Sequence, residues 1–239
     1  MIPKIIHYCW FGTKKKDECN NNYVRSWKDI LPDYQIIEWN ESNFDISANR
    51  YTREAYEQKK YAFVSDVCRM YALQQMGGIY LDTDVQVLQK FDPFLQEHSF
   101  IGEEQNGKLL GTAVIGAEPG EAWVSDFLAQ YDKLSFKKCF GILDTTANTE
   151  RLTKFLKKYK KSKPHIYPID YFCAKDYKTD KIISTKNTVC IHHYASSWVK
   201  PLKCQKYEEI IWAKLGIKNL NITGKLYGRV IIPLKKIIF

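Results

Sequence analysis

Short apolar stretches rich in β-branched and aromatic residues alternate along the chain with longer stretches in which apolar residues recur at helical spacing. The first kind predicts strands at 4–10, 34–39, 79–81, 99–103, 112–117 and 188–194. The second kind predicts helices at about 18–30, 52–76, 121–131 and 149–160. Strands that alternate with helices are typical of an α/β sandwich built around a mainly parallel sheet.

The composition fits one folded domain. With 239 residues, 45% apolar and 26% charged, the chain is excluded from the disordered and fibrous classes. The sequence holds no run of 18 or more apolar residues, and residues 1–7 lack the pattern of a signal peptide. Seven cysteines without a C-x-x-C pair indicate neither a disulfide framework nor a zinc site. We therefore expect a cytoplasmic chain.

Charge is distributed unevenly between the two parts of the chain. Residues 1–150 hold 16 basic and 22 acidic residues, a net −6, whereas residues 151–239 hold 20 and 5, a net +15. The basic end points to a polyanion or an anionic surface. Because the chain carries no recognised nucleic-acid motif, we expect no nucleic-acid partner.

The segment 203–239 mixes apolar and basic residues and is predicted to be an amphipathic extension of a domain at 1–202. Such a segment can lie on an anionic membrane without crossing it, which would place the protein on the inner face of the cell membrane. The alternative is that the extension packs on the surface of the domain.

Asp82 and Asp84 follow the short apolar strand at 79–81, which itself follows the helix-ending pair Gly77-Gly78. Aspartates two apart at a strand end point the same way and lie where α/β folds bind ligands. Their oxygens suit Mn²⁺ or Mg²⁺ bridging a diphosphate. The alternative is a solvated turn.

Asp66 and Arg69 lie three residues apart, on one face of the predicted helix at 52–76. A structural salt bridge is the simpler interpretation. The second is a polar pair that holds the hydroxyl groups of a sugar, for which the donor fork of arginine is suited.

The ordered set of motifs resembles glycosyltransferase family 32, the DXD sugar-binding family, which includes bacterial capsular and lipopolysaccharide sugar transferases and is similar to initiating mannosyltransferases. The matching pieces are 2–12, 26–27, 32–34, 38–40, 61–66, Arg69, 77–84, 192–194 and 197–198. The resemblance implies a GT-A type, Rossmann-like α/β/α sandwich with a basic C-terminal extension. It also implies a retaining transferase that uses a nucleotide sugar and Mn²⁺ or Mg²⁺.

By the same resemblance, Trp10 stacks on the nucleotide base, with the backbone of Cys9 nearby. Ser65 and Tyr80 line the ribose and the base.

On the sugar side, the resemblance implies that Asp66 and Arg69 grip the donor sugar. Asp82 contacts the ribose or the sugar and reaches the metal partly through water. Asp84 is a direct metal ligand. These four residues form the implied catalytic centre.

The late strand offers the remaining predicted ligands. His193, Ser196 and Trp198 resemble the C-terminal clamp of related retaining transferases: His193 as a third metal ligand, Ser196 beside it and Trp198 on the diphosphate. Strand alternation then turns His192 to the opposite face. The alternative for His193 is a core histidine.

Two segments depart from the family pattern. Gly111, Thr112 and Ala113 replace an Asn-containing segment near the donor sugar, and 145–149 replaces a Gly-Pro-rich turn. No single residue in either segment is predicted to bind substrate.

The expected reaction moves a hexose or N-acetylhexosamine from a nucleotide sugar, with UDP preferred, to a lipid-linked saccharide in capsule, exopolysaccharide or O-antigen synthesis. Two alternatives stay open: a GDP-mannose-dependent mannosyltransferase, and an inactive nucleotide-sugar-binding protein. The intact Asp82-x-Asp84 pair argues against inactivity.

Overall fold

A computed structural model describes residues 1–13, 16, 18–105 and 107–195. Its strands are β1 (Ile5–Cys9), β2 (Gln35–Trp39), β3 (Gly78–Leu81), β4 (Val85–Val87), β5 (Ser99–Glu104), β6 (Leu109–Ala117), β7 (His165–Tyr167) and β8 (Cys190–His192). Its helices are α1 (Glu18–Ile30), α2 (Arg50–Glu57), α3 (Tyr61–Met76), α4 (Ala122–Tyr131), α5 (Asn148–Lys158) and α6 (Ile169–Phe172), with 3-10 turns at Asp92–Phe94 and Cys139–Gly141. Ser196, Trp198 and the predicted extension at 203–239 lie outside the described residues.

The central sheet has six strands in the order β2-β1-β3-β6-β5-β7. The pairs β1–β2, β1–β3 and β5–β7 are parallel, whereas β6 runs antiparallel to both β3 and β5. The predicted α/β fold with a mainly parallel sheet is therefore confirmed. β4 and β8 form a separate antiparallel pair, which the sequence did not indicate.

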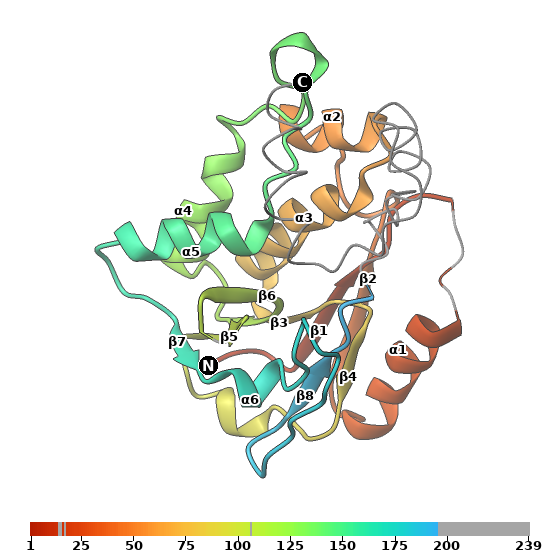
Figure 1. The fold of residues 1–239 in the computed structure, drawn as a ribbon, viewed down its shortest axis with the longest axis vertical. Helices are drawn as coiled ribbons and strands as arrows, with labels where there is room; N and C mark the ends of the chain where they lie inside the picture. The colour runs from red at the N-terminus through yellow and green to blue at the C-terminus, as the bar shows by residue number, and fades with distance from the viewer. Residues whose placement is uncertain (14–15, 17, 106, 196–239) are drawn as a thin grey trace, which may run out of the picture. The chain divides into compact units, whose positions relative to one another are not determined.

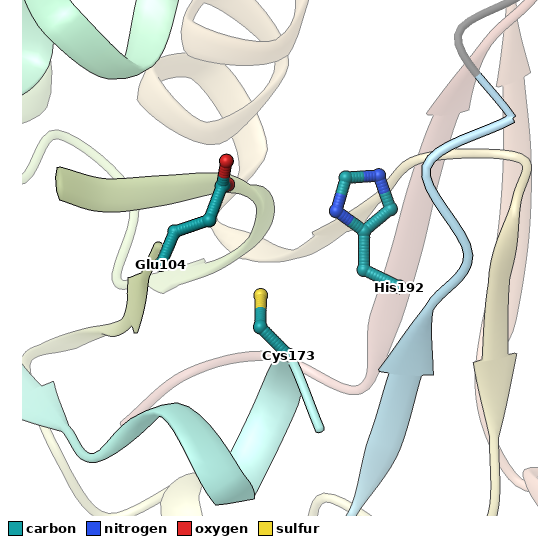
Figure 2. Close-up of side chains that lie close together, drawn as sticks. All are labelled: Glu104, Cys173 and His192. Atoms are coloured by element: carbon teal, nitrogen blue, oxygen red, sulfur yellow. The ribbon is translucent and has the colours of Figure 1, made fainter. Parts of the chain in front are cut away.

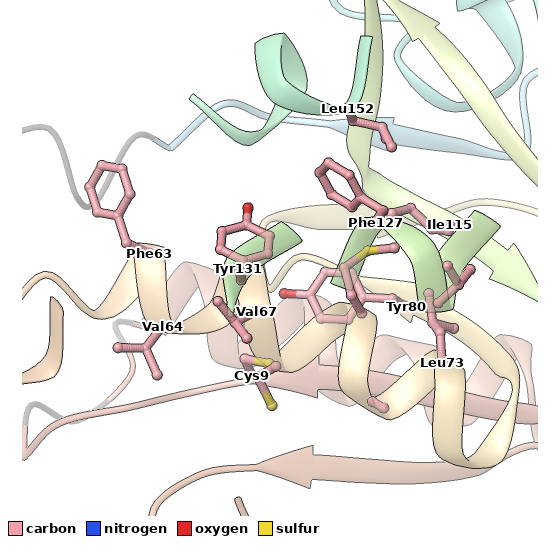
Figure 3. Close-up of a cluster of buried hydrophobic side chains, with 14 of the residues drawn as sticks. Cys9, Phe63, Val64, Val67, Leu73, Tyr80, Ile115, Phe127, Tyr131 and Leu152 are labelled. Carbon is pink, nitrogen blue, oxygen red and sulfur yellow. The ribbon is translucent and has the colours of Figure 1, made fainter. Parts of the chain in front are cut away.

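Helices cover both faces of the sheet, as Figure 1 shows: α2 to α5 lie on one side, and α1, α6 and the β4–β8 pair lie on the other. Each side has its own apolar cluster. One contains Val64, Leu73 and Phe127 from α3 and α4 (Figure 3), and the other contains Trp27 of α1 and Phe172 of α6. Burial of these faces against the sheet stabilises the sandwich.

The helix predicted at 52–76 is two helices, because the chain turns between α2 and α3. Lys59 has a φ of +55°, and its N–H donates to the carbonyl oxygen of Tyr56. The Lys60 N–H donates to the carbonyl oxygen of Ala55 at 2.9 Å. This pattern is a Schellman motif, in which glycine usually takes the left-handed position. A lysine takes that position here, so the sequence carried no stop signal.

The predicted stop at Gly77-Gly78 is confirmed. Their φ values are +62° and +101°, a region that favours glycine. A Cβ at Gly77 would lie 2.6 Å from the Pro119 ring, and a Cβ at Gly78 would lie 2.6 Å from the carbonyl oxygen of Ile5. The glycine pair thus lets α3 turn directly into β3 beside β1.

His7 holds the junction between α3 and β3 in place. The fully buried ring of His7 donates from Nε2 to the carbonyl oxygen of Gly77 at 2.7 Å, and its Nδ1 accepts from Trp39 Nε1 at 3.0 Å. Burial lowers the pKa of His7 to about 4, which keeps the ring neutral. The residue before β3 is therefore held by a hydrogen bond from β1, and Trp39 of β2 orients the His7 ring that makes it.

Among the described residues, no helix has the length and apolar character needed to span a membrane.

Candidate functional site

Asp82 and Asp84 lie at the carboxyl end of β3, as predicted. All four residues of β3 are buried, and the Asp82 N–H continues the sheet by donating to the carbonyl oxygen of Ala113 at 2.9 Å. The Val85 N–H then donates back to the Asp82 carbonyl oxygen at 3.0 Å, which closes a tight turn. The two side chains remain partly accessible, 27% for Asp82 and 13% for Asp84.

Asp84 is held by groups from the late part of the chain. The Ala195 N–H donates to Oδ2 at 2.7 Å, and His192 Nε2 lies 3.5 Å from Oδ1. Burial alone would raise the pKa of Asp84, but the His192 and Ala195 contacts outweigh it and lower the pKa. Asp84 is therefore ionised at neutral pH and available to a cation.

His192, rather than the predicted His193, lies beside the aspartates. His193 Nε2 contacts Gln86 Oε1 at 2.9 Å, and its ring stacks on Tyr23 with centroids 4.9 Å apart. Neighbouring residues of β8 do alternate in direction, but the pairing of His192 with Val85 of β4 turns His192 to the site. The predicted alternation is present, and the side chain that faces the aspartates is that of His192, while the His193 N–H donates to the Asp84 carbonyl oxygen at 3.1 Å.

The side chains gathered here fit a divalent cation. Asp82, Asp84 and His192 each offer one ligand atom, and these atoms lie within 4.8 Å of one another. Two carboxylates and an imidazole suit Mn²⁺ or Mg²⁺ better than a soft metal.

Asp66 and Arg69 form the predicted salt bridge, and it is buried. Arg69 Nη2 lies 2.9 Å from Asp66 Oδ1 and 3.4 Å from Asp82 Oδ1, while Nη1 donates to the Thr112 carbonyl oxygen at 2.5 Å. Arg69 is 5% exposed and Asp66 is 9% exposed. Arg69 therefore joins the α3 carboxylate to the end of β3, and its contact at Thr112 falls in the segment that departs from the family pattern.

Burial and charge act differently on the two partners. Burial raises the pKa of Asp66 to about 6, despite the neighbouring Arg69 charge. Burial opposes the charge of Arg69 as well, but Asp82, Tyr80 and Asp66 outweigh it and raise the pKa of Arg69. The arginine is permanently charged, whereas Asp66 titrates near physiological pH.

Tyr80 supports the site from within the core. It is 1% exposed, its hydroxyl donates to Asp82 Oδ1 at 2.9 Å, and its ring lies 4.6 Å from Arg69 Cζ. This placement fixes the orientation of Asp82. It leaves little of the ring accessible to a ribose or a base, the contact that the resemblance implied.

The residues implied for the nucleotide lie near the same sheet edge. Trp10 directly follows β1, its N–H donates to the Trp39 carbonyl oxygen at 2.9 Å, and its half-buried ring lies 5.9 Å from Lys16 Nζ. Cys9 is buried, and the Ser65 hydroxyl donates to the Tyr61 carbonyl oxygen at 3.1 Å. Because β1 and β3 are parallel neighbours, Trp10 and Asp82 share the carboxyl edge.

The structure adds residues that the sequence analysis did not identify. Asn148, at the start of α5, lies close enough to Asp66 to lower its pKa, and its Oδ1 accepts from the Tyr131 hydroxyl at 2.8 Å. Asn148 falls in the segment 145–149, where no substrate-binding residue was predicted. An asparagine at the start of a helix is also common as a capping residue, so its position did not identify Asn148 as a site residue.

Sheet order, paired aspartates and helical layers place the chain among the GT-A folds. Residues 17–101 match the sequence model of the family described as "Glycosyltransferase sugar-binding region containing DXD motif". The resemblance stated above is thereby confirmed over residues 17–101, which are similar to the DXD sugar-binding region of these glycosyltransferases. The solved PaToxG glycosyltransferase has a similar fold, with a TM-score of 0.53 and 17% identity over 66% of this chain and 69% of that chain.

Two curated fungal proteins are similar to this chain. Inositol phosphoceramide mannosyltransferase 3 of Schizosaccharomyces pombe is 28% identical over 155 residues, which cover 62% of this chain and 42% of that protein. Mannosyl phosphorylinositol ceramide synthase SUR1 of Saccharomyces cerevisiae is 28% identical over 155 residues, 61% of this chain and 40% of that protein. The chain thus spans less than half the length of these relatives.

Proposed function

We propose that the protein is a metal-dependent, retaining glycosyltransferase that moves a hexose from a nucleotide sugar to a lipid-bearing acceptor. The observation that carries this proposal is the convergence of Asp82, Asp84 and His192 directly beside the Asp66–Arg69 pair. Asp82 belongs to the group of cation ligands and also contacts Arg69 of the pair proposed to bind the sugar.

Each group has a defined task in this proposal. Asp84 and His192 hold the cation, and Asp82 completes the set while Arg69 and Tyr80 fix its orientation. A bound divalent cation supplies Lewis acidity that stabilises the negative charge of a departing nucleoside diphosphate. Trp10 at the same edge offers a ring on which a base can stack.

In this proposal, the configuration of the transferred sugar is retained because the acceptor hydroxyl attacks the sugar on the face from which the diphosphate leaves. Asp66 is the carboxylate nearest to the sugar in this arrangement. It is 9% exposed and its Oδ1 is paired with Arg69, which favours contact with a sugar hydroxyl over covalent attack. Asp66 is therefore a binding group in the proposal.

The choice between the two donors rests on the relatives rather than on the residues of the site. From the sequence, a UDP-sugar is the preferred donor and GDP-mannose is the alternative. Both curated relatives described above are named for mannose transfer to a ceramide-bearing lipid. Mannosyl transfer from GDP-mannose is therefore the second candidate function, and a lipid-bearing acceptor is common to both candidates.

The donor is tested with the full chain and a panel of GDP-mannose and UDP-hexoses, with and without Mn²⁺. We expect Mn²⁺-dependent thermal stabilisation and slow release of nucleoside diphosphate with one member, because a ligand that binds only the folded state raises its stability. Stabilisation by GDP-mannose alone selects the mannosyl function. No stabilisation and no release with any donor would contradict transferase activity.

Capsule or O-antigen synthesis at the inner face of the cell membrane remains part of the proposal, supported by the basic segment after residue 150. Flotation of the full chain with anionic liposomes, compared with a chain ending at residue 222, tests the membrane contact. Equal flotation of the two chains would remove the role given to the extension.

A further inference from the structure

A second group of side chains with metal-ligating atoms, Glu104, Cys173 and His192, lies close together, as Figure 2 shows. Glu104 ends β5, Cys173 directly follows α6, and His192 ends β8. One ligand atom from each lies within 4.8 Å of the other two. The three residues come from separate parts of the chain, so no motif of fixed spacing in the sequence predicts that they lie together.

Glu104 and Cys173 are buried, and one nitrogen of His192 lacks a hydrogen-bond partner among the described residues. Glu104 is 6% exposed and Cys173 is 3% exposed. His192 Nδ1 is buried and has no hydrogen-bond partner among the described residues. In Figure 2 this nitrogen faces Glu104 and Cys173, while Nε2 is the atom 3.5 Å from Asp84.

We propose that Glu104, Cys173 and His192 Nδ1 form a binding site for Zn²⁺ that shares only His192 with the site at the paired aspartates. A thiolate, an imidazole and a carboxylate are the ligands that Zn²⁺ takes, and three protein ligands leave a fourth position for water. Binding forms a metal–sulfur and a metal–nitrogen bond, and it releases to solvent the thiol proton of Cys173 and the proton that a charged His192 carries on Nδ1.

The two sites differ in chemistry. The sulfur of Cys173 selects a borderline-soft cation, whereas the oxygen-rich set of Asp82 and Asp84 suits Mn²⁺ or Mg²⁺. Gly111 lies beside both groups, because a Cβ there would be in van der Waals contact with Glu104 Oε2 at 3.5 Å and with Cys173 Sγ at 3.6 Å. The simpler alternative is that the Cys173 thiol donates weakly to His192 and no metal binds.

Co²⁺ serves as the probe, since it occupies zinc sites and shows a thiolate-to-metal charge-transfer band. The full chain is stripped with a chelator, titrated with Co²⁺ and then with Zn²⁺. We expect one equivalent of Co²⁺ with the band, and its loss when Zn²⁺ displaces the cobalt. The band disappears in Cys173→Ser and persists in the matched control Cys139→Ser, whose thiol is exposed and far from the cluster in sequence.

A second variant keeps the test independent of any folding defect in Cys173→Ser. Glu104→Gln retains shape and removes the charge, and we expect it to weaken Co²⁺ binding at least tenfold, the lower end of the loss seen when even supporting groups of metal sites are changed. The Asp84→Asn variant retains the band. The proposal is overturned if the wild-type chain shows no band, if the band survives in Cys173→Ser, or if Glu104→Gln binds Co²⁺ as tightly as the wild type.

Discussion

Two charged pairs flank the end of β3, and they differ in how their polar atoms are used. In the Asp66–Arg69 pair, Arg69 contacts two carboxylates and a backbone carbonyl, all within the core. In the Asp84–His192 pair, the atoms are 3.5 Å apart, and the second nitrogen of His192 has no partner among the described residues. The first pair is a completed buried network, whereas the second pair keeps capacity to bind.

The two pairs therefore have different roles, although the family resemblance assigns Asp66, Arg69, Asp82 and Asp84 to one catalytic centre. Arg69 determines where Asp82 lies, so it supports the site mainly through structure. In the proposed function, Asp84 and His192 are the groups that hold the cation. We therefore expect changes at Arg69 to lower the free energy of unfolding, and changes at Asp84 to lower activity.

The strongest test of this contrast is Arg69→Met. It leaves Asp66 and Asp82 without their shared cation, and loss of one partner of a buried pair costs about 3–5 kcal/mol of the free energy of unfolding. Urea unfolding measures the loss. The control is Lys154→Met, because Lys154 is 74% exposed and pairs with Glu150, 50% exposed, on the surface of α5, where we expect a loss below about 1 kcal/mol. Equal losses at the two positions would contradict the role given to Arg69.

Asp84→Asn tests the other side of the comparison. The amide oxygen can still accept from the Ala195 N–H, but it is a weaker cation ligand, so we expect transfer to fall by at least ~100-fold. Activity with the selected donor and Mn²⁺ measures the effect. Asp126→Asn is a matched change at a surface aspartate paired with Lys161, and it should leave activity unchanged. Normal turnover of Asp84→Asn would remove Asp84 from the cation site.

The pH dependence of stability reports on Asp66. Burial raises its pKa from about 3.8 to about 6, so the folded state binds this proton more tightly than the unfolded chain. Its stabilising contribution is complete below the unfolded pKa and is lost as the pH rises through about 6, an effect of about 3 kcal/mol. Unfolding of the wild type and Asp66→Asn at acidic and neutral pH measures it. A constant difference between the two proteins would contradict the raised pKa.

The smallest expected effect concerns the two sites that share His192. A neutral imidazole has one nitrogen with a free lone pair, so Zn²⁺ at Nδ1 leaves Nε2 protonated and unable to bind Mn²⁺. We expect Zn²⁺ to weaken Mn²⁺ binding at least ~5-fold, the lower end of ordinary coupling between sites. Titration of Mn²⁺ by electron paramagnetic resonance, with and without Zn²⁺, measures this shift. In Cys173→Ser the shift should vanish, and an unchanged shift there would place the zinc elsewhere.

The sequence predicted the elements that local chemistry determines. Gly77-Gly78 predicted the turn from α3 into β3. The apolar run before Asp82 predicted that both aspartates lie at the end of this strand. The break at Lys59 was missed because lysine occupies a position where glycine is the usual signal. β4 and β7 were missed because three-residue strands carry too little alternation.

Within the site, predictions failed where a side chain depends on a distant partner. The choice between His192 and His193 rests on the register of β8 against β4, which no local pattern determines. Tyr80 was assigned to the nucleotide, yet its hydroxyl is bound to Asp82 in the core. Glu104, Cys173 and Asn148 reach their positions only through the packing of β5, α6 and α5.

The pairing of β4 with β8 also bears on how the protein matures on the ribosome. Asp84 is held by Ala195, 111 residues further along the chain. Every strand of the large sheet, up to Tyr167 of β7, is synthesised before Cys190 begins β8. At ~5–20 residues per second, a nascent chain therefore has the sheet and both aspartates in place for about a second or more before the histidine arrives. Loading of the proposed cation site would then follow synthesis of the sheet, and a chain released before β8 would lack the His192 and Ala195 groups that contact Asp84.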